Sequence, residues 1–300
     1  MKKCFFSRVV SLFAFVAILG GTLLFASPTD VSAQTQSGAA AMVPKAVRDN
    51  GVLRVGSQQT FPPVEFKKPG ETAVVGVSAD LLAEIAKRLG LRLEYIHGEY
   101  VSLIPGLEAG RFDIASGGIS DTVEREQKLD FVNYMMSGCS ILIQAKDAAT
   151  FSTIDDFCGR KMATLLGSNV IMAAVDQASK RCVSAGKAPI TVEQLPSAPD
   201  ARMQLDLKRV EGYLGDFPAL VYMLSNYPGN YKIAGGNFLL TQYVTSWAFS
   251  KNNSGLRDAV QTVTKEMLKD GTYAALLKKW DLEGGALPDI TINLPATKRK

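Results

Sequence analysis

The chain has 300 residues, and its 33 Lys and Arg against 29 Asp and Glu give a formal net charge of +4 at neutral pH. So small an excess gives no reason to expect a nucleic acid or an anionic membrane as a partner. His97 is the only histidine and no Cys-x-x-Cys pair occurs, so the usual zinc ligands are missing. We expect neither a metal nor another cofactor.

The N-terminus has the features of an export signal. It combines a basic start, a largely apolar run and a small-residue cleavage pattern: Lys2, Lys3 and Arg8, then Val9–Ala26, then Val31-Ser32-Ala33. A membrane anchor is the alternative, but Gly20 and Gly21 interrupt the apolar run. We expect cleavage after Ala33 and a periplasmic mature chain that is not inserted in the membrane. The net charge would fall from +4 to +2, because three basic residues and Asp30 leave with the signal.

Strand-like and helix-like segments alternate in the first half of the mature chain. The pattern predicts strands at 53–56, 91–96 and 113–116 and helices at 78–89 and 102–108. We expect Ser78 to cap the first helix and Pro105 to lie in the first turn of the second, where proline is tolerated. This rhythm predicts an α/β fold with a mostly parallel sheet and helices on both faces.

A second unit of the same kind follows. Its expected strands are at 161–165, 190–195 and 212–215, and its expected helices at 168–180, 201–208 and 217–225. The chain then returns through a strand at 244–249 and ends in helices at 256–269 and 272–280. Periodicity alone does not tell which unit these last helices join.

The most informative stretch is residues 112–125, which reads Phe-Asp-Ile-Ala-Ser-Gly-Gly-Ile-Ser-Asp-Thr-Val-Glu-Arg. Glycine allows a ligand close to the backbone, so Gly118 and Ser120 could donate to an anion. The guanidinium of Arg125 matches a carboxylate in a bidentate way. Together they predict a pocket for a small carboxylic acid. The alternatives are an ordinary turn for the loop and a surface salt bridge with Glu124 or Glu126 for the arginine.

This stretch resembles the carboxylate clamp of the periplasmic polar-amino-acid-binding proteins, the solute-binding proteins of ABC importers (bacterial solute-binding protein family 3). The family's other motifs recur in order, over about residues 45–285: Gly51–Gly56, Phe61–Phe66, Ser102–Leu107, Gly110–Asp113, Thr122–Arg125, Asp130-Phe131 and Asp270–Trp280. The resemblance implies a two-lobed periplasmic binding protein of type II, a monomer, with two hinge strands near Ile141–Gln144 and Val244–Trp247.

The resemblance also implies a division of the chain. Lobe 1 combines residues 45–142 with 245–292, and lobe 2 spans 143–244. From the residues themselves we expect 1–33 to be the signal, 34–44 a linker and 293–300 a tail, whose basic end Lys298-Arg299-Lys300 is solvated.

Three cysteines remain once Cys4 leaves with the signal. In the oxidising periplasm we expect a disulfide between Cys158 and Cys182, a pair that members of this family often carry. Cys139 would then stay free and buried.

Further ligand-binding residues follow from the resemblance. Asp216 stands where the family binds the ligand's α-ammonium, although an aspartate before a helix is also a common N-cap. Ser168 and Asn169 begin a helix whose free N–H groups can hold an anion, although the family usually has Gly-Thr-Thr there. The remaining positions are two aromatic platforms that could equally be core residues, and a neutral residue where cation-binding members tend to carry Asp: Phe61, Tyr100 and Gln58.

The resemblance implies a binding protein, not an enzyme, that captures a small polar amino acid and delivers it to an inner-membrane ABC permease. A similar fold serves cyclohexadienyl (prephenate or arogenate) dehydratases, whose Ser-Gly-Ile-Ser run is like Ser116–Ser120. Such an enzyme needs a general acid in the cleft, and the sequence shows no clear candidate. A ligand-binding input to a membrane sensor is the second alternative.

Overall fold

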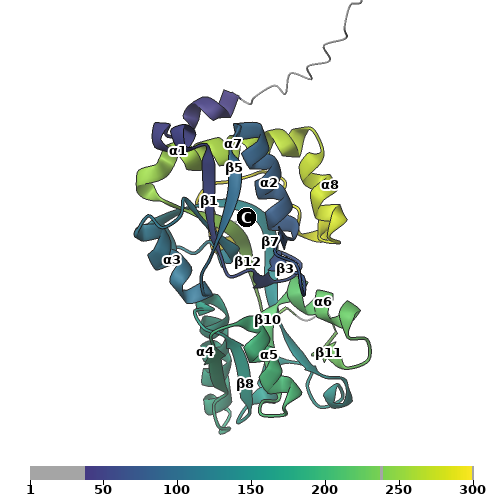
Figure 1. Ribbon diagram of the computed structural model, residues 1–300. Coiled ribbons are helices and arrows are strands. Elements are labelled where there is room, and N and C mark those ends of the chain that lie inside the picture. The colour runs from purple at the N-terminus through teal and green to yellow at the C-terminus, as the bar shows by residue number, and fades with distance from the viewer. Residues whose placement is uncertain (1–37, 237–238, 299–300) are drawn as a thin grey trace, which may run out of the picture. The chain divides into compact units, whose positions relative to one another are not determined.

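The computed structural model describes residues 38–236 and 239–298 (Figure 1). The predicted signal at 1–33 lies outside these residues. Within them, no helix is both long enough and apolar enough to cross a membrane.

A large mixed sheet runs through both predicted lobes, with the strand order β5-β1-β6-β12-β7-β10-β8-β9. In lobe 1, β1 pairs in parallel with two strands: β1 is Val52–Ser57, β5 Arg92–His97 and β6 Ile114–Ser120. In lobe 2, β8 pairs in parallel with two others: β8 is Lys161–Leu165, β9 Thr191–Leu195 and β10 Gly212–Asp216. The predicted α/β class is confirmed.

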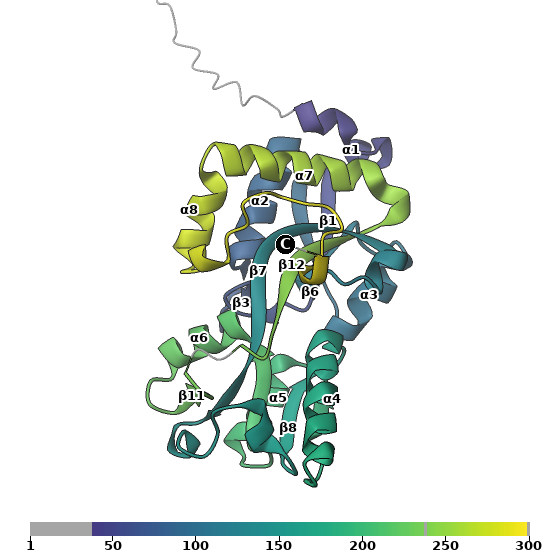
Figure 2. The same cartoon turned by 180° about the vertical axis from the view of Figure 1, so that it is seen from behind.

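Two long strands connect the lobes. They are β7 (Leu129–Gln144) and β12 (Thr241–Ser250), which pair with each other in an antiparallel ladder (Figure 2). The predicted lobe boundaries, at 142/143 and 244/245, fall inside these strands and stay a prediction. The shorter strands are β11 (Tyr231–Ile233), beside β7, and a small separate sheet of β2 (Thr60–Phe61), β3 (Glu65–Lys67) and β4 (Val74–Val75).

The helices form two groups. With β1 and β5 lie α1 (Lys45–Asn50), α2 (Val77–Leu89), α3 (Tyr100–Glu108), α7 (Ser254–Lys269) and α8 (Thr272–Lys279) (Figure 1). With β8 and β10 lie α4 (Asn169–Ser184), α5 (Ala198–Asp206) and α6 (Phe217–Asn226). The C-terminal helices α7 and α8 therefore lie beside α2, while the division of the chain into two lobes stays a prediction.

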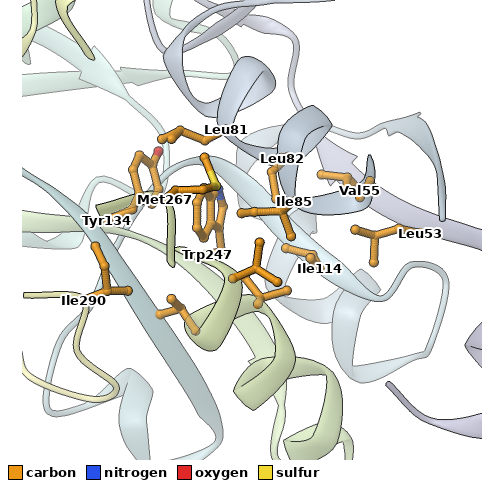
Figure 3. Close-up of a cluster of buried hydrophobic side chains, with 14 of the residues drawn as sticks. Leu53, Val55, Leu81, Leu82, Ile85, Ile114, Tyr134, Trp247, Met267 and Ile290 are labelled. Atoms are coloured by element: carbon orange, nitrogen blue, oxygen red, sulfur yellow. The ribbon is translucent and has the colours of Figure 1, made fainter. Parts of the chain in front are cut away.

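The core of lobe 1 forms around Trp247, which stacks on Tyr134 with ring centroids 4.3 Å apart (Figure 3). Leu81, Leu82 and Ile85 of α2 are fully buried in this core. Burying a side chain of this size contributes about 1.5–3 kcal/mol.

Two predicted details of these helices are wrong. Ser78 does not cap α2, because the helix begins one residue earlier and the hydroxyl turns inward to donate to Glu65 Oε2 at 3.0 Å. Pro105 lies inside α3, not in its first turn, because that helix already starts at Tyr100.

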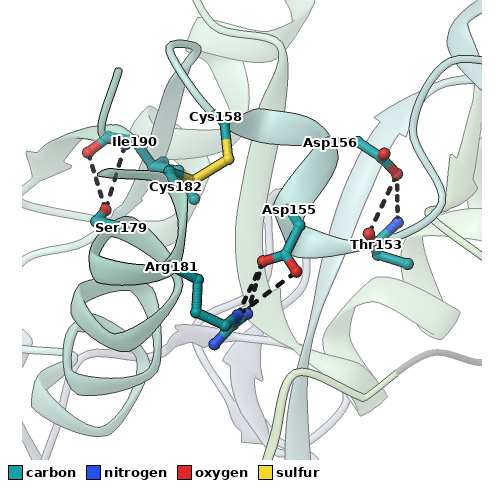
Figure 4. The surroundings of a disulfide bond; sticks show 8 residues. All are labelled: Thr153, Asp155, Asp156, Cys158, Ser179, Arg181, Cys182 and Ile190. Carbon is teal, nitrogen blue, oxygen red and sulfur yellow. Dashed lines mark hydrogen bonds and ion pairs between the residues drawn. A yellow bond between two sulfur atoms is a disulfide. The ribbon is translucent and has the colours of Figure 1, made fainter. Parts of the chain in front are cut away.

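The predicted disulfide between Cys158 and Cys182 is present, with the Cα atoms 5.5 Å apart (Figure 4). It joins the short 3-10 helix η4 (Ile154–Phe157) to the last turn of α4. Beside it, Arg181 pairs with Asp155 at 2.7 Å. Cys139 is free and buried within β7.

The described parts of the predicted linker and tail are packed in part, although Thr297 and Lys298 are exposed. Gly38–Met42 forms a 3-10 helix, and Ala39 and Val43 join the core of lobe 1. At the other end, Ile292 forms a bridge with Val132 of β7, and residues 296–298 form a last 3-10 turn, η7. Small apolar side chains at one end and hydrogen-bonding ones at the other explain why both segments dock.

Candidate functional site

The structure brings the predicted ligand residues together around one pocket, with the exception of Phe61. The pocket lies between residues of lobe 1 and lobe 2. Its lining includes the predicted residues Gln58, Tyr100, Gly118, Ser120, Arg125, Ser168, Asn169 and Asp216. Their placement agrees with a shared site, while their contact with a ligand stays a proposal.

The glycine and serine loop is the end of β6. Gly117 and Gly118 have φ angles of +96° and +85°, a region that favours glycine. A Cβ at position 118 would lie 2.4 Å from the ring of Phe61. Phe61 is buried, packs against this loop and is not among the residues that line the pocket, so its role as a platform stays a prediction. On the pocket side, Gln58 donates to the Gly117 carbonyl at 3.4 Å.

Arg125 comes from the 3-10 turn η2 (Arg125–Gln127), just beyond the loop. Its Nη1 donates to the carbonyl of Ser120 at 2.9 Å, and its Nη2 donates to the carbonyl of Gly167 at 3.4 Å. Among residues 38–236 and 239–298, no carboxylate lies within 4.0 Å of this guanidinium. The surface salt bridge is therefore absent: Glu126 pairs with Lys298 instead, at 2.7 Å.

Asp216 ends β10 and occupies the N-cap position of α6, but its side chain makes no capping hydrogen bond. No cation of the described residues pairs with it. Burial raises the pKa of its carboxyl to about 7, because water that would stabilise the charge is excluded. The pocket wall thus holds an acid that lacks a counter-ion within the described structure.

The start of α4 forms the third side of the pocket. Ser168 is its N-cap residue and makes no side-chain capping bond. Val170 and Ile171 also line the pocket, and N–H groups in the first turn of a helix have no carbonyl of their own helix to bind. Gly167 faces Tyr100 at the N-terminus of α3, because a Cβ at position 167 would lie 3.5 Å from the Tyr100 ring.

Sequence reasoning missed several lining residues, namely Gly117, Leu165, Val170, Ile171 and Tyr243. Tyr243 is buried in β12 and its hydroxyl donates to the carbonyl of Gly138 at 3.2 Å. Only the antiparallel pairing of β12 with β7 brings it to the pocket, and no local pattern reveals that pairing. Gly117 could have been predicted as a lining residue, because it lies in the same glycine and serine loop as Gly118 and Ser120.

The lining combines a single guanidinium with a single carboxylate among the described residues. Backbone N–H groups and neutral amide, hydroxyl and aromatic groups complete it. This arrangement can bind a small molecule that carries a negative and a positive group at once. No cluster of metal-ligating side chains occurs in the part of the chain that the structure describes.

Comparisons with known proteins agree with this chemistry. A model of the bacterial extracellular solute-binding proteins, family 3, matches residues 53–283. The arginine-binding protein ArgT of Corynebacterium glutamicum is 28% identical over 253 residues, which cover 84% of this chain and 82% of ArgT.

Two solved structures are also similar. An ancestral arginine-binding protein bound to glutamine is 32% identical, covers 77% of this chain and 97% of its own, and has a TM-score of 0.66. The ancestral amino acid-binding protein AncCDT-1, a precursor of cyclohexadienyl dehydratase, is 27% identical, with coverages of 78% and 97% and a TM-score of 0.68.

Proposed function

The chain belongs to the bacterial extracellular solute-binding proteins, family 3, and we propose that it captures a small polar amino acid in the periplasm and delivers it to an ABC-type permease of the inner membrane. One observation carries the proposal: Arg125 of lobe 1 and Asp216 of lobe 2 line the same pocket, and neither has an ion-pair partner within the described residues. An amino acid zwitterion supplies both missing charges.

In this proposal each lobe binds one charged group of the ligand. Arg125 with the N–H groups of Gly118 and Ser120 holds the carboxylate, and Asp216 accepts hydrogen bonds from the α-ammonium. Contacts from both lobes form together only when the lobes are close, so the ligand stabilises the closed arrangement.

The affinity expected from these contacts is micromolar or better. A micromolar dissociation constant corresponds to about −8 kcal/mol. Hydrogen bonds to charged groups contribute about 1.5–3 kcal/mol each, so a carboxylate clamp and an ammonium contact reach this range after the cost of closure.

We further propose that the ligand has an uncharged side chain, as glutamine has. Asp216 is the single carboxylate of the described lining, and the α-ammonium would occupy it. A positively charged group on the ligand's side chain would instead face Gln58, a neutral residue that is 3% exposed. Burying an ammonium or guanidinium without a counter-charge is costly, so arginine and lysine should bind weakly.

Calorimetric titration tests both parts of the proposal. We expect L-glutamine, or another neutral polar amino acid, to bind at micromolar concentration and L-arginine at least tenfold more weakly. The variant Gln58→Asp should reverse that order, because it adds a carboxylate beside the side-chain end of the ligand. Failure of the wild-type chain to bind any amino acid would overturn the function. Tighter binding of arginine by the wild-type chain would overturn the preference alone.

An enzyme on this fold has one observation in its favour. With a pKa of about 7 and a place in the pocket, Asp216 has the properties of a general acid that the sequence alone did not reveal. Incubation with prephenate and with arogenate separates the two functions: we expect no product above the uncatalysed rate, and turnover that Asp216→Asn removes would establish a dehydratase.

A further inference from the structure

Two acidic side chains, Asp121 and Glu126, belong to the segment that carries Arg125. Asp121 follows Ser120 and Glu126 follows Arg125, so both acids belong to the segment 120–126. Asp121 is 2% exposed, and Asn133 of β7 donates to its Oδ2 at 2.8 Å. The other oxygens, Asp121 Oδ1 and Glu126 Oε1, are buried and meet no donor among the described residues.

Two carboxyl groups in contact can hydrogen bond only through a proton held between them. Burial and the neighbouring charge of Glu126 raise the pKa of Asp121 to about 7. Asp121 therefore holds its proton to a higher pH than a solvated carboxyl group does, and losing that proton adds a negative charge beside Glu126.

The C-terminal segment of residues 290–298, which we call the C-terminal strap, closes over this pair. Thr291 donates to Asn133 Oδ1 at 2.7 Å, and Asn133 is the side chain that donates to Asp121. At the end of the strap, Lys298 Nζ lies 2.7 Å from Glu126 Oε2. The strap thus reaches both acids, one through an amide and the other through an ion pair.

We propose that Lys298, Glu126, Asp121 and Asn133 are positioning residues, through which the C-terminal strap holds the segment 120–126 in the geometry that receives the ligand's carboxylate. A segment that is ordered before binding loses less entropy when the ligand arrives, so affinity rises. The expected effect on affinity rests on the proposed function, whereas the effect on the segment itself needs no ligand.

The groups that face the pair come from several elements. Glu126 belongs to η2, Lys298 to η7 and Asn133 to β7, and Asn133 also donates to Ser246 of β12 at 2.8 Å. Glu126 and Lys298 are the charged groups that act on the titration of Asp121. Loss of the Lys298 ammonium leaves Glu126 without its cation, and this should loosen the segment most above neutral pH.

Hydrogen exchange measured by mass spectrometry tests the proposal on the ligand-free chain. Peptides covering 118–128 should exchange several-fold faster in Lys298→Met than in the wild type, after correction for intrinsic rates, with a larger difference at pH 8.5 than at pH 6.5. Lys265→Met is the matched control, since Lys265 pairs with Asp289 on the surface at 3.4 Å and should leave these peptides unchanged.

A second variant tests whether Lys298 acts through Glu126. In a Glu126→Gln background, Lys298→Met should have little further effect on exchange. Titration with L-glutamine should show about tenfold weaker binding for Lys298→Met and unchanged binding for Lys265→Met. Wild-type exchange of residues 118–128 in Lys298→Met would overturn the proposal. If the wild-type chain binds no amino acid, the proposed function fails, and the exchange result still decides the role of the strap.

Discussion

Asp216 gives ligand binding a defined pH dependence. Its pKa is about 7 without ligand, and an ammonium requires the carboxylate form, so below pH 7 binding must first expel a proton. The dissociation constant should therefore be about tenfold higher at pH 6 than at pH 8. The stability of the ligand-free chain changes with pH in the opposite direction. Because the pKa of Asp216 in the folded chain lies above its ordinary value, the free energy of unfolding falls as the pH rises toward 7.

Calorimetry on wild type and Asp216→Asn isolates this contribution, because Asp121 titrates in the same range in both proteins. The variant should bind weakly and should not show the loss of affinity on acidification. The same loss in the variant would show that another group is responsible.

The substitution Gly118→Ala tests whether the loop at the end of β6 needs a glycine at this position. The substitution Gly118→Ala places a methyl group 2.4 Å from the Phe61 ring and forces alanine to a φ of +85°. Gly51→Ala is the control, since Gly51 has a φ of +63° but no atom within 4 Å of the added Cβ. Backbone strain of this kind costs about 1–3 kcal/mol. Urea unfolding should show a larger loss for Gly118→Ala, together with weakened ligand binding; equal losses would mean that the contact with Phe61 is relieved easily.

At the scale of elements, the disulfide stabilises lobe 2 without forming the pocket. Cys158 and Cys182 close a loop with a sequence separation of 24. Replacing both with serine should reduce the free energy of unfolding by about 3 kcal/mol, mainly because the unfolded chain gains freedom. Ligand affinity should change less than twofold, since the pocket meets α4 at its other end. A large loss of affinity would show that the position of α4 depends on the bond.

The sequence predicted most helices and strands because each carries its own periodicity, as the buried face of α2 shows. Prediction from the sequence failed where contacts between distant residues determine the position of a side chain or segment. Ser78 looked like a cap, yet the buried Glu65 and Trp247 draw its hydroxyl inward. Residues 293–298 of the strap were predicted to be part of a tail, because their partners Asn133 and Glu126 lie far away in the sequence.

At the scale of the whole molecule, the pocket exists only because distant segments meet. Arg125 and Asp216 could be named from short motifs, whereas Tyr243 could not, because its place depends on how β12 pairs with β7. The prediction that α7 and α8 return to lobe 1 followed from family resemblance and not from periodicity.

Ligand binding should also stabilise the whole chain. A ligand at 100 times its dissociation constant adds about 2.7 kcal/mol to the free energy of unfolding. We expect a higher melting temperature with L-glutamine at this concentration, and a shift no more than about half as large with the same concentration of L-arginine. Equal shifts would contradict an uncharged ligand side chain.

The role of Arg125 is tested most directly by titrating its alanine variant with the amino acid that the wild type binds. Arg92→Ala is the control, because Arg92 is exposed and pairs with Glu94 on the surface at 3.2 Å. We predict that Arg125→Ala remains folded and loses binding by at least a hundredfold, whereas Arg92→Ala binds like the wild type. Wild-type affinity in Arg125→Ala would contradict the assignment of this guanidinium to the ligand's carboxylate.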